Sequence, residues 1–550
     1  MLHRSLSMLL FALLCPALAL ANPALEGYAN YAALAESVRK LDESDVVAVS
    51  SLGKTTGGRD ILLLTLGRGE VAKKPAIAIV GGVDASHVLG SELALRLAEK
   101  LVADQDNEAV KRLLDEVTIY LVPRPDPDAV EKAFAAPFRE VVGNLRKTDD
   151  DRDGKAGEDP PDDLNGDGWI TQMRVADEFG RWMPHATDGR VLIEVDPKKN
   201  ERGQFRIYTE GRDDDGDGQF NEDAGDGVAF NRNFPHRFQH FQAGTGHDAV
   251  SEAESRAVAD FLYDHTNVFA VFCFSNEDNL FHPWKPDGNK DKAKIRTTVL
   301  STDASYLDYL AGKYRDLHGG KDAPEAPWPA GTFSEWSYFQ YGRWTYSARG
   351  WWLPRVAEKE GERKSDEQRG ADDLNALRWF AQENIAGFAD WQKVDHPDLS
   401  DKTVEVGGFK AFYRKNPPAK TIDELAGKHV SLLTLLASER SRVKIKESKV
   451  EPLGGGVFRV TAIVASSGYL PTMSEMGETT GVHQRLQVQL VTQEKTRYLK
   501  GPPRVKLGRI EPGAEREVVW LIRLPGEKGE GKLRAWSPEV GEAEVSIKFE

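Results

Sequence analysis

The sequence predicts an α/β domain, in which helices cover both faces of a central sheet, followed by a C-terminal all-β sandwich. Two observations predict the first fold class. Short apolar runs end at glycine or proline, and between them apolar residues recur every three or four positions, as in helices. A third observation predicts the sandwich, because short alternating strands separated by glycine and proline turns replace this pattern from about residue 444.

Residues 1–21 have the pattern of a secretory signal peptide. His3 and Arg4 precede an apolar run, and Ala19-Leu20-Ala21 matches the small residues before a cleavage site, so we expect cleavage before Asn22. The run is too short to cross a bilayer, and no later stretch of about 20 apolar residues follows. We therefore expect an exported protein, periplasmic or extracellular, without a membrane span.

Charge and cysteine content narrow the range of partners. The net charge of −15 argues against nucleic acid, because a surface that binds nucleic acid is basic. Cys15 belongs to the predicted signal peptide, which leaves Cys273 alone and allows no internal disulfide. An exported chain without disulfides needs another source of stability, and the acidic composition suggests bound cations. The oligomeric state does not follow from the sequence.

The first candidate site follows a buried strand. Residues 76–80 form an apolar run, Gly81-Gly82 ends it, and leucines at every fourth position then predict a helix over residues 88–102. The turn between them contains Asp84 and His87, and both residue types are common metal ligands. Side chains at the carboxyl end of such a strand face the crevice where open α/β sheets bind ligands.

The same patterns predict the remaining elements. In the first part, strands are expected at residues 46–52, 61–66, 117–122 and 268–274, and helices at residues 28–41 and 371–391. Ser251, with Glu254 three residues later, predicts a capping box that opens a further helix. In the C-terminal part, strands are expected at residues 457–464, 486–492, 517–524 and 544–549.

Residues 149–226 form an acidic insert with three segments of the pattern D-x-D/N-x-D-G. Oxygen ligands at loop positions one, three and five, with glycine at six for the sharp turn, are what calcium requires from a short loop. Arg174 stands at position twelve of the middle loop, where an EF-hand has glutamate, so these loops are EF-hand-like only. The predicted calcium ligands are Asp149, Asp151, Asp153, Glu158, Asp159, Asp163, Asn165, Asp167, Asp213, Asp215, Asp217, Glu222 and Asp223. The alternative is a disordered acidic insert.

Several motifs between about residues 28 and 418 resemble those of the zinc carboxypeptidases, the carboxypeptidase A-like metallopeptidases. They are the Gly81-Gly82 turn, Arg146-Lys147-Thr148, Asn231-Arg232-Asn233 before an aromatic residue, and the segment 331–353. The resemblance implies a mixed central sheet and an enzyme that uses zinc to remove C-terminal residues from peptides. It implies that Arg146 polarises the scissile carbonyl and that Asn231 and Arg232 hold the terminal carboxylate. Arg59 is then expected to reach the outer substrate cleft.

The chain departs from that family at the metal site. The family's Gly-Gly-x-His-x-x-Glu turn reads here with Asp84 and His87 in exchanged positions, and Phe274-Ser275 stands where the third ligand, a histidine, is expected. Two ligands are fewer than the three of a catalytic zinc site. The family's general base falls at Arg349 or Gly350, and an arginine, with a pKa above about 12, cannot accept a proton from water.

Two arrangements of this site remain open. In the first, a third zinc ligand comes from Glu277, Asp278 or His282. In the second, no metal is held: His87 makes local hydrogen bonds at the start of its helix, and Asp84 pairs with Arg349, whose cation replaces the metal ion.

We predict a carboxypeptidase-like domain at residues 22–395, which includes the insert 149–226, a connecting segment at 396–443 and the β-sandwich at 444–550. Three functions are compatible with these features. The first is an exported, calcium-binding member of the family that is catalytically impaired and binds peptide or protein C-termini. The second is an active metallocarboxypeptidase with a rearranged zinc site. The third is a calcium-stabilised extracellular interaction protein.

Overall fold

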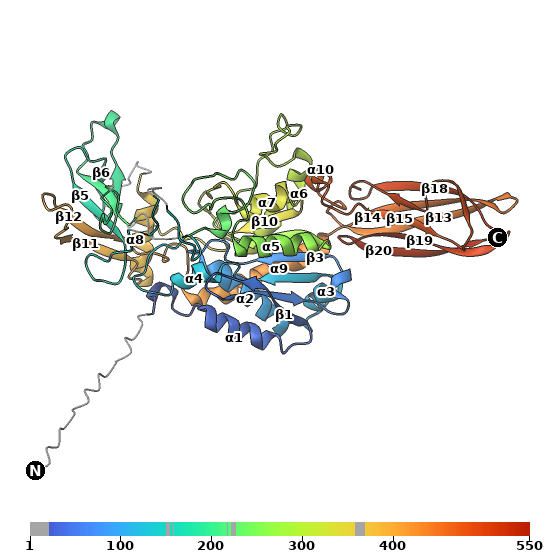
Figure 1. The fold of residues 1–550 in the computed structure, drawn as a ribbon, viewed down its shortest axis with the longest axis horizontal. Coiled ribbons are helices and arrows are strands. Elements are labelled where there is room, and N and C mark those ends of the chain that lie inside the picture. Colours follow the sequence, from blue (N-terminus) through green and yellow to red (C-terminus); the bar gives the residue numbers. More distant parts are fainter. Residues whose placement is uncertain (1–20, 150–153, 158, 217, 222–226, 358–368) are drawn as a thin grey trace, which may run out of the picture.

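The computed structural model describes residues 21–149, 154–157, 159–216, 218–221, 227–357 and 369–550 (Figure 1). The signal-peptide prediction therefore lies almost entirely outside the described residues. Within these ranges, no helix is long and apolar enough to cross a membrane. An α/β body lies at the centre of Figure 1, with a smaller sheet on one side and a strand-rich body at the C-terminal end.

A six-stranded sheet forms the centre of the α/β body. Its strands are β1 (Val47–Lys54), β2 (Asp60–Leu66), β3 (Ala76–Val80), β4 (Thr118–Val122), β9 (Val268–Phe274) and β10 (Trp344–Ala348). They lie in the order β1-β2-β4-β3-β9-β10; the last four are parallel, whereas β1, β2 and β4 pair antiparallel. Every residue of β3 is buried, as expected for a central strand covered on both faces. The predicted mixed sheet with helices on both faces is confirmed.

Successive residues of each strand point to opposite faces, which creates two cores. Ile77 and Ile79 face the first core, and Ala78 and Val80 face the second. The first core contains residues of α1 (Tyr31–Leu41), α2 (Val88–Ala103), α3 (Glu108–Glu116), α4 (Pro127–Lys132), α6 (Ser301–His318) and α9 (Ile422–Glu439). The second core contains residues of α5 (Ala253–Asp264) and α7 (Phe333–Phe339).

Two local predictions are wrong at helix ends. Helix α5 begins after Glu252, not Ser251, because the Ser251 hydroxyl donates a hydrogen bond to the Glu252 carboxylate and does not cap the helix. The helix expected at residues 371–391 ends earlier: α8 (Ala371–Glu383) stops at Asn384, which adopts the left-handed conformation with φ of 55°. A strand begins four residues after Asn384.

The insert contributes to a second six-stranded sheet, which is antiparallel. Its strands are β5 (Gln172–Ala176), β6 (Trp182–Pro184), β7 (Leu192–Glu194), β8 (Phe205–Thr209), β11 (Phe388–Val394) and β12 (Val404–Phe409), in the order β11-β12-β5-β8-β6-β7. The sheet thus joins insert strands to strands on both sides of residue 395, where we placed a domain boundary. Met173 and Val406 are fully buried in its core. The described part of the insert is therefore folded, in contrast to the disordered alternative.

Two four-stranded sheets form the C-terminal body, which confirms the predicted β-sandwich. One contains β13 (Arg442–Gly454), β14 (Val457–Ser467), β18 (Glu515–Arg523) and β16 (Arg497–Lys500); the other contains β17 (Arg504–Lys506), β15 (Gln487–Val491), β19 (Gly529–Ser537) and β20 (Gly541–Phe549). A short helix, α10 (Glu475–Thr480), lies at the junction with the α/β body.

A buried carboxylate fastens the sandwich to the α/β body. Asp303 on α6 accepts hydrogen bonds from the backbone N–H groups of Glu475 and Met476 at 2.8 and 3.0 Å. It also accepts from the Tyr338 hydroxyl at 3.0 Å and forms an ion pair of 3.2 Å with Arg509. Because an ion of this kind is stable only while its partners remain in place, we expect the two bodies to stay docked.

Candidate functional site

The site lies at the carboxyl ends of β3 and β9, as predicted for the turn that carries Asp84. One carboxylate oxygen of Asp84 accepts hydrogen bonds from the Asn276 N–H at 2.7 Å and the Ser275 hydroxyl at 3.0 Å. The other accepts from the side-chain amide of Asn231 at 2.9 Å. Three donors therefore satisfy the Asp84 carboxylate without a metal ion.

A second carboxyl, that of Glu277, lies in the same network. Its side chain is buried and accepts a hydrogen bond from Asn231 at 2.9 Å, and its carboxyl shares a second hydrogen bond with the oxygen of the Ser275 hydroxyl, whose own proton is donated to Asp84. Burial and the neighbouring Asp84 carboxylate raise the pKa of Glu277 to about 8. Glu277 is therefore mostly protonated at neutral pH, which leaves Asp84 as the one negative charge of the pair.

His87 stands immediately before α2, at its N-cap, but its imidazole does not cap the helix. The ring is fully buried, and neither ring nitrogen has a hydrogen-bond partner among the residues that the structure describes. Burial lowers the pKa of His87 to about 4, so the imidazole is neutral at physiological pH. The local hydrogen bonds that we considered for this side chain are absent from the described part of the chain.

Arg349 directly follows β10, and the family's general base was expected at Arg349 or Gly350. Its guanidinium donates to the carbonyl oxygen of Asn276 at 3.0 Å and to that of Pro324 at 3.4 Å. Its backbone N–H donates to Asp278 at 3.1 Å. No carboxylate within the described ranges lies within 4.0 Å of the guanidinium, so the salt bridge to Asp84 that we considered does not form. Arg349 instead binds the carbonyl oxygens of the loop after β9 and of the loop that contains Pro324.

Arg232 lies in a short 3-10 helix, Phe230–Arg232, beside this network. Its Nη1 donates to the Ala243 carbonyl at 2.9 Å, whereas its Nε is buried without a hydrogen-bond partner in the described residues. In the same part of the chain, no carboxylate forms an ion pair with it. Burial lowers the pKa of the Arg232 guanidinium, which nevertheless stays protonated. This half-buried cation has an unused donor and, among the residues that the structure describes, no counter-ion.

The other predicted substrate-binding residues already have partners. The Asn231 amide points inward, and its oxygen accepts the Phe333 N–H at 3.0 Å. Arg146 forms an ion pair with Glu252, a buried residue at the start of α5. Arg59 forms an ion pair of 2.7 Å with Asp128, whose side chain is fully buried. A ligand that used Arg146 or Arg59 would compete with these carboxylates, whereas Arg232 has no such competitor.

A family model described as zinc carboxypeptidase matches residues 34–351, which is more than half of the chain. This chain belongs to the zinc carboxypeptidase family. A second model, a domain of unknown function, matches residues 442–548 and coincides with the β-sandwich. The family assignment agrees with the mixed sheet and with the position of the site at the carboxyl ends of its parallel strands.

Individual relatives of this zinc carboxypeptidase family member match only short segments. Human carboxypeptidase D is 32% identical over 138 residues, which are 24% of this chain and 10% of that protein. A zinc carboxypeptidase from Saccharothrix mutabilis subsp. capreolus is 29% identical over 117 residues, 20% of this chain and 27% of that protein. Among solved structures, carboxypeptidase A from Helicoverpa armigera aligns over 74% of this chain and 73% of its own, with 14% identity and a TM-score of 0.39.

The donor set at the site does not fit the zinc ion of the family. The described residues contain no group of three or more His, Cys, Asp or Glu side chains arranged to hold a metal. The third-ligand position is occupied by Phe274, which is fully buried in the core, and by the Ser275 hydroxyl. Asp278, the alternative ligand, accepts the N–H groups of Leu280 and Phe281 at 3.0 and 2.8 Å. We therefore derive no hydrolytic step through zinc.

The acidic loops of this zinc carboxypeptidase homologue are held by their first aspartates. Asp163 accepts the N–H groups of Gly166 at 2.8 Å and Gly168 at 2.7 Å, and Asp213 makes the same two bonds to Gly216 and Gly218 at 2.7 and 3.1 Å. Asp149 accepts the Gly154 N–H at 3.1 Å, and buried Asp159 accepts the Asp214 N–H at 2.6 Å. Of the predicted calcium ligands, Asp151, Asp153, Glu158, Asp217, Glu222 and Asp223 lie outside the described residues.

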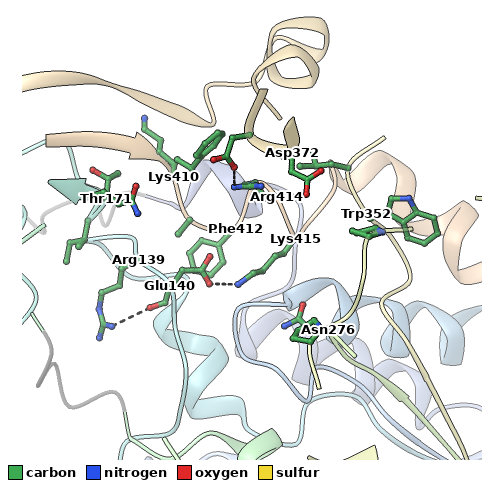
Figure 2. A pocket seen from close by; sticks show the side chains of 18 of the residues that line it. Arg139, Glu140, Thr171, Asn276, Trp352, Asp372, Lys410, Phe412, Arg414 and Lys415 are labelled. Atoms are coloured by element: carbon green, nitrogen blue, oxygen red, sulfur yellow. Dashed lines mark hydrogen bonds and ion pairs between the residues drawn. The ribbon is translucent and has the colours of Figure 1, made fainter. Parts of the chain in front are cut away.

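A cleft of about 850 Å³ lies beside the site (Figure 2). Asn276 and Arg349 line it from the carboxyl end of the first sheet, and Lys410, Arg414 and Lys415 line it from the segment after β12. The residues that we predicted to bind substrate are not among the described residues that line it. This cleft could not be predicted from the sequence, because its basic residues come from segments far apart in the chain and only the fold brings them together.

Proposed function

We propose that this chain is a zinc carboxypeptidase homologue that has lost efficient hydrolysis and binds the C-terminal carboxylate of peptides through Arg232. The observation that carries the proposal is the state of this guanidinium: it is half-buried, lacks a counter-ion among the described residues and has an unpartnered Nε. An arginine forks onto a carboxylate with two charge-assisted hydrogen bonds, so a free peptide terminus is a suitable partner.

Two observations support the proposed loss of hydrolysis. Asp84 is satisfied by hydrogen-bond donors, and Arg349 replaces a general base whose contribution is about 10²–10⁴ in rate. An arginine at this position would also repel a metal ion nearby. The alternative is an active enzyme with a rearranged zinc site, which predicts release of C-terminal residues that stops when a zinc chelator is added.

Calorimetry with matched peptides tests the proposal. A peptide with a free C-terminus should bind, and its C-terminal amide should bind at least about tenfold more weakly, because a charged hydrogen bond contributes about 1.5–3 kcal/mol. The Arg232→Gln variant should bind both forms as weakly as the wild type binds the amide. Arg516→Gln, which removes an exposed arginine of the sandwich, is the matched control and should bind like the wild type. Equal binding of the acid and the amide would refute carboxylate recognition. The third function, an interaction protein that does not use the family's substrate cleft, would then be the one that is left.

We also propose that the acidic loops bind calcium and that the mature protein is exported. In support, the first aspartate of each loop accepts an N–H from the glycine at position six, which holds these two described positions of the loop together. Calcium would then stiffen a chain that has no disulfide. Titration of calcium into chelator-treated protein, followed by calorimetry, tests this directly, and absence of heat would refute it. Sequencing the mature N-terminus tests cleavage before Asn22; an intact Met1 would contradict export.

A further inference from the structure

We propose that the cleft beside the site selects peptides with acidic side chains shortly before their C-terminus. This inference rests on the proposed function, since it places the peptide's terminal carboxylate at Arg232. The hydrogen-bond network of the site links the cleft to the residue next to Arg232. Asn276 lines the cleft, its N–H donates to Asp84, and Asp84 accepts from Asn231, the residue before Arg232.

The cleft has room for several residues of a peptide. Its volume of about 850 Å³ lies near the upper end of the range of about 300–1,000 Å³ that is typical of ligand sites. Figure 2 shows its walls: Lys410, Arg414 and Lys415 come from the segment after β12, and Asn276 and Trp352 come from the loops at the end of the first sheet. A ligand in this cleft therefore contacts segments that follow strands of both sheets.

Charge distinguishes this cleft from the rest of the chain. Six cationic side chains and four acidic ones line it, whereas the whole chain has a net charge of −15. Three ion pairs with N–O distances of 2.7 to 2.8 Å use three of those acids: Lys415–Glu140, Arg414–Asp373 and Arg355–Asp372. The remaining acid, Asp322, is exposed. The surplus is therefore positive, in an otherwise acidic protein.

Two of the cations have no carboxylate partner within the described ranges. The Lys410 ammonium lies 5.3 Å from the centroid of the Trp169 ring, and no carboxylate of the described residues lies within 4.0 Å of it. The Arg349 guanidinium donates only to backbone carbonyl oxygens. A half-buried cation that no carboxylate pairs with directly favours an anionic ligand, because the ligand supplies a paired charge.

The apolar part of the lining favours a peptide over a small inorganic anion. Trp352 and Phe409 are half-buried lining residues, and Trp352 stacks on the His318 ring with centroids 5.0 Å apart. Carbon surface between separated cations suits a chain that carries carboxylates on apolar stems, such as glutamate side chains. A phosphate or sulfate ion would use the charges but leave most of the volume and the aromatic surface without contact.

Four peptides test the inference. One pair is identical except for Glu or Gln at the two positions before a free C-terminal residue; the second pair carries the same sequences as C-terminal amides. Binding is measured by fluorescence polarisation at low and at moderate salt. We expect the Glu peptide to bind at least about fivefold more tightly than the Gln peptide, and the difference to shrink as salt rises.

Two variants assign the preference to the cleft. Lys410→Gln should reduce the Glu-over-Gln preference at least about threefold, whereas Lys528→Gln, which removes an exposed lysine of the sandwich, should preserve it. Arg232→Gln should weaken both free-acid peptides equally and keep their ratio. Equal binding of the Glu and Gln peptides, or a preference unchanged in Lys410→Gln, would overturn the inference.

The amide pair separates failure of the inference from failure of the proposed function. If the acid and amide forms bind alike while the Glu preference depends on Lys410, the Arg232 proposal fails and the acidic preference of the cleft stands alone. If the free acids bind better than the amides but Glu and Gln bind alike, the proposed function stands and the inference fails. Binding of none of the four peptides would overturn both.

Discussion

The buried carboxyl of Glu277 gives a quantitative test of the site. Its pKa rises from an ordinary value of 4.5 to about 8 in the folded chain, mainly through burial. Between these two values the folded chain holds a proton that the unfolded chain has lost, so stability falls as pH rises, by about 1.4 kcal/mol per pH unit. The contribution is fully present below pH 4.5 and is lost as pH passes through about 8.

The Glu277→Gln variant removes this proton but keeps the size and the hydrogen-bonding capacity of the side chain. From pH 6.5 to 8.0 the wild type should therefore lose about 1.6 kcal/mol of unfolding free energy relative to the variant, because the slope decreases as the pH approaches the pKa of about 8. Buried His87, with its pKa lowered to about 4, gains a proton on unfolding near its ordinary pKa of 6.5, but both chains contain this residue and its contribution cancels in their difference. At pH 6.5 the variant should differ from the wild type by about 1 kcal/mol or less.

Urea unfolding followed by tryptophan fluorescence, with calcium held constant, measures both chains at several pH values. Glu527→Gln, which removes a carboxyl from an exposed turn of the sandwich, is the control and should not change the pH dependence. Parallel curves for the wild type and Glu277→Gln would refute the reasoning, because they would mean that Glu277 is already ionised at neutral pH. A metal ion beside Asp84 would produce that result.

Three further predictions concern the junction, the loops and the chemistry. Asp303→Ala should lower the unfolding free energy by about 3–5 kcal/mol in urea denaturation, because it leaves two backbone N–H groups and the Tyr338 hydroxyl without their acceptor and removes one carboxylate partner of Arg509, which also pairs with Glu511. Asp308→Ala, exposed on the same helix, should cost under about 1 kcal/mol. A calcium chelator should lower the Tm in calorimetry, and an unchanged Tm would contradict calcium binding. The Asp163→Ala variant should show a smaller decrease in Tm, whereas the control Asp390→Ala, exposed on β11, should show the same decrease as the wild type. Added zinc should produce no release of C-terminal residues from peptides in a mass-spectrometric assay, and chelator-sensitive release would establish the active alternative.

The local parts of the fold follow from the sequence because their signals are local. The apolar run of β3 and the leucine spacing of α2 fix a strand, a turn and a helix within about 30 residues, so the position of Asp84 at a strand end could be predicted. The parallel arrangement of β3 and β9 follows once the family resemblance supplies their order. The sandwich strands were predictable for the same reason, since alternation and turn residues are properties of short segments.

The contacts of Asp84 could not be predicted, because its partners are distant in sequence. Asn231 and Ser275 lie 147 and 191 residues away, and neither carries a charge that would mark it as a partner. Charge alone favoured Arg349, which instead satisfies backbone carbonyl oxygens of two loops. The inward orientation of the Asn231 amide could not be predicted either. This amide donates to Asp84 and to the buried Glu277, and no sequence pattern shows that these three side chains meet.

The second sheet shows a similar limit. Its insert strands are short, and β12, the partner of β5, lies more than 200 residues later in the chain, so no local pattern joins them. The cleft depends on this pairing, because Lys410 and Arg414 directly follow β12. Its acidic preference therefore became visible only from the folded arrangement.

Metal analysis of the purified, full-length protein tests the central claim most directly. After incubation with excess zinc and calcium and removal of free ions, elemental mass spectrometry should find calcium but less than about 0.1 zinc per chain. We expect little zinc because amide and hydroxyl donors already satisfy the Asp84 carboxylate. About one zinc per chain, lost in Asp84→Ala and retained in Asp390→Ala, would contradict it.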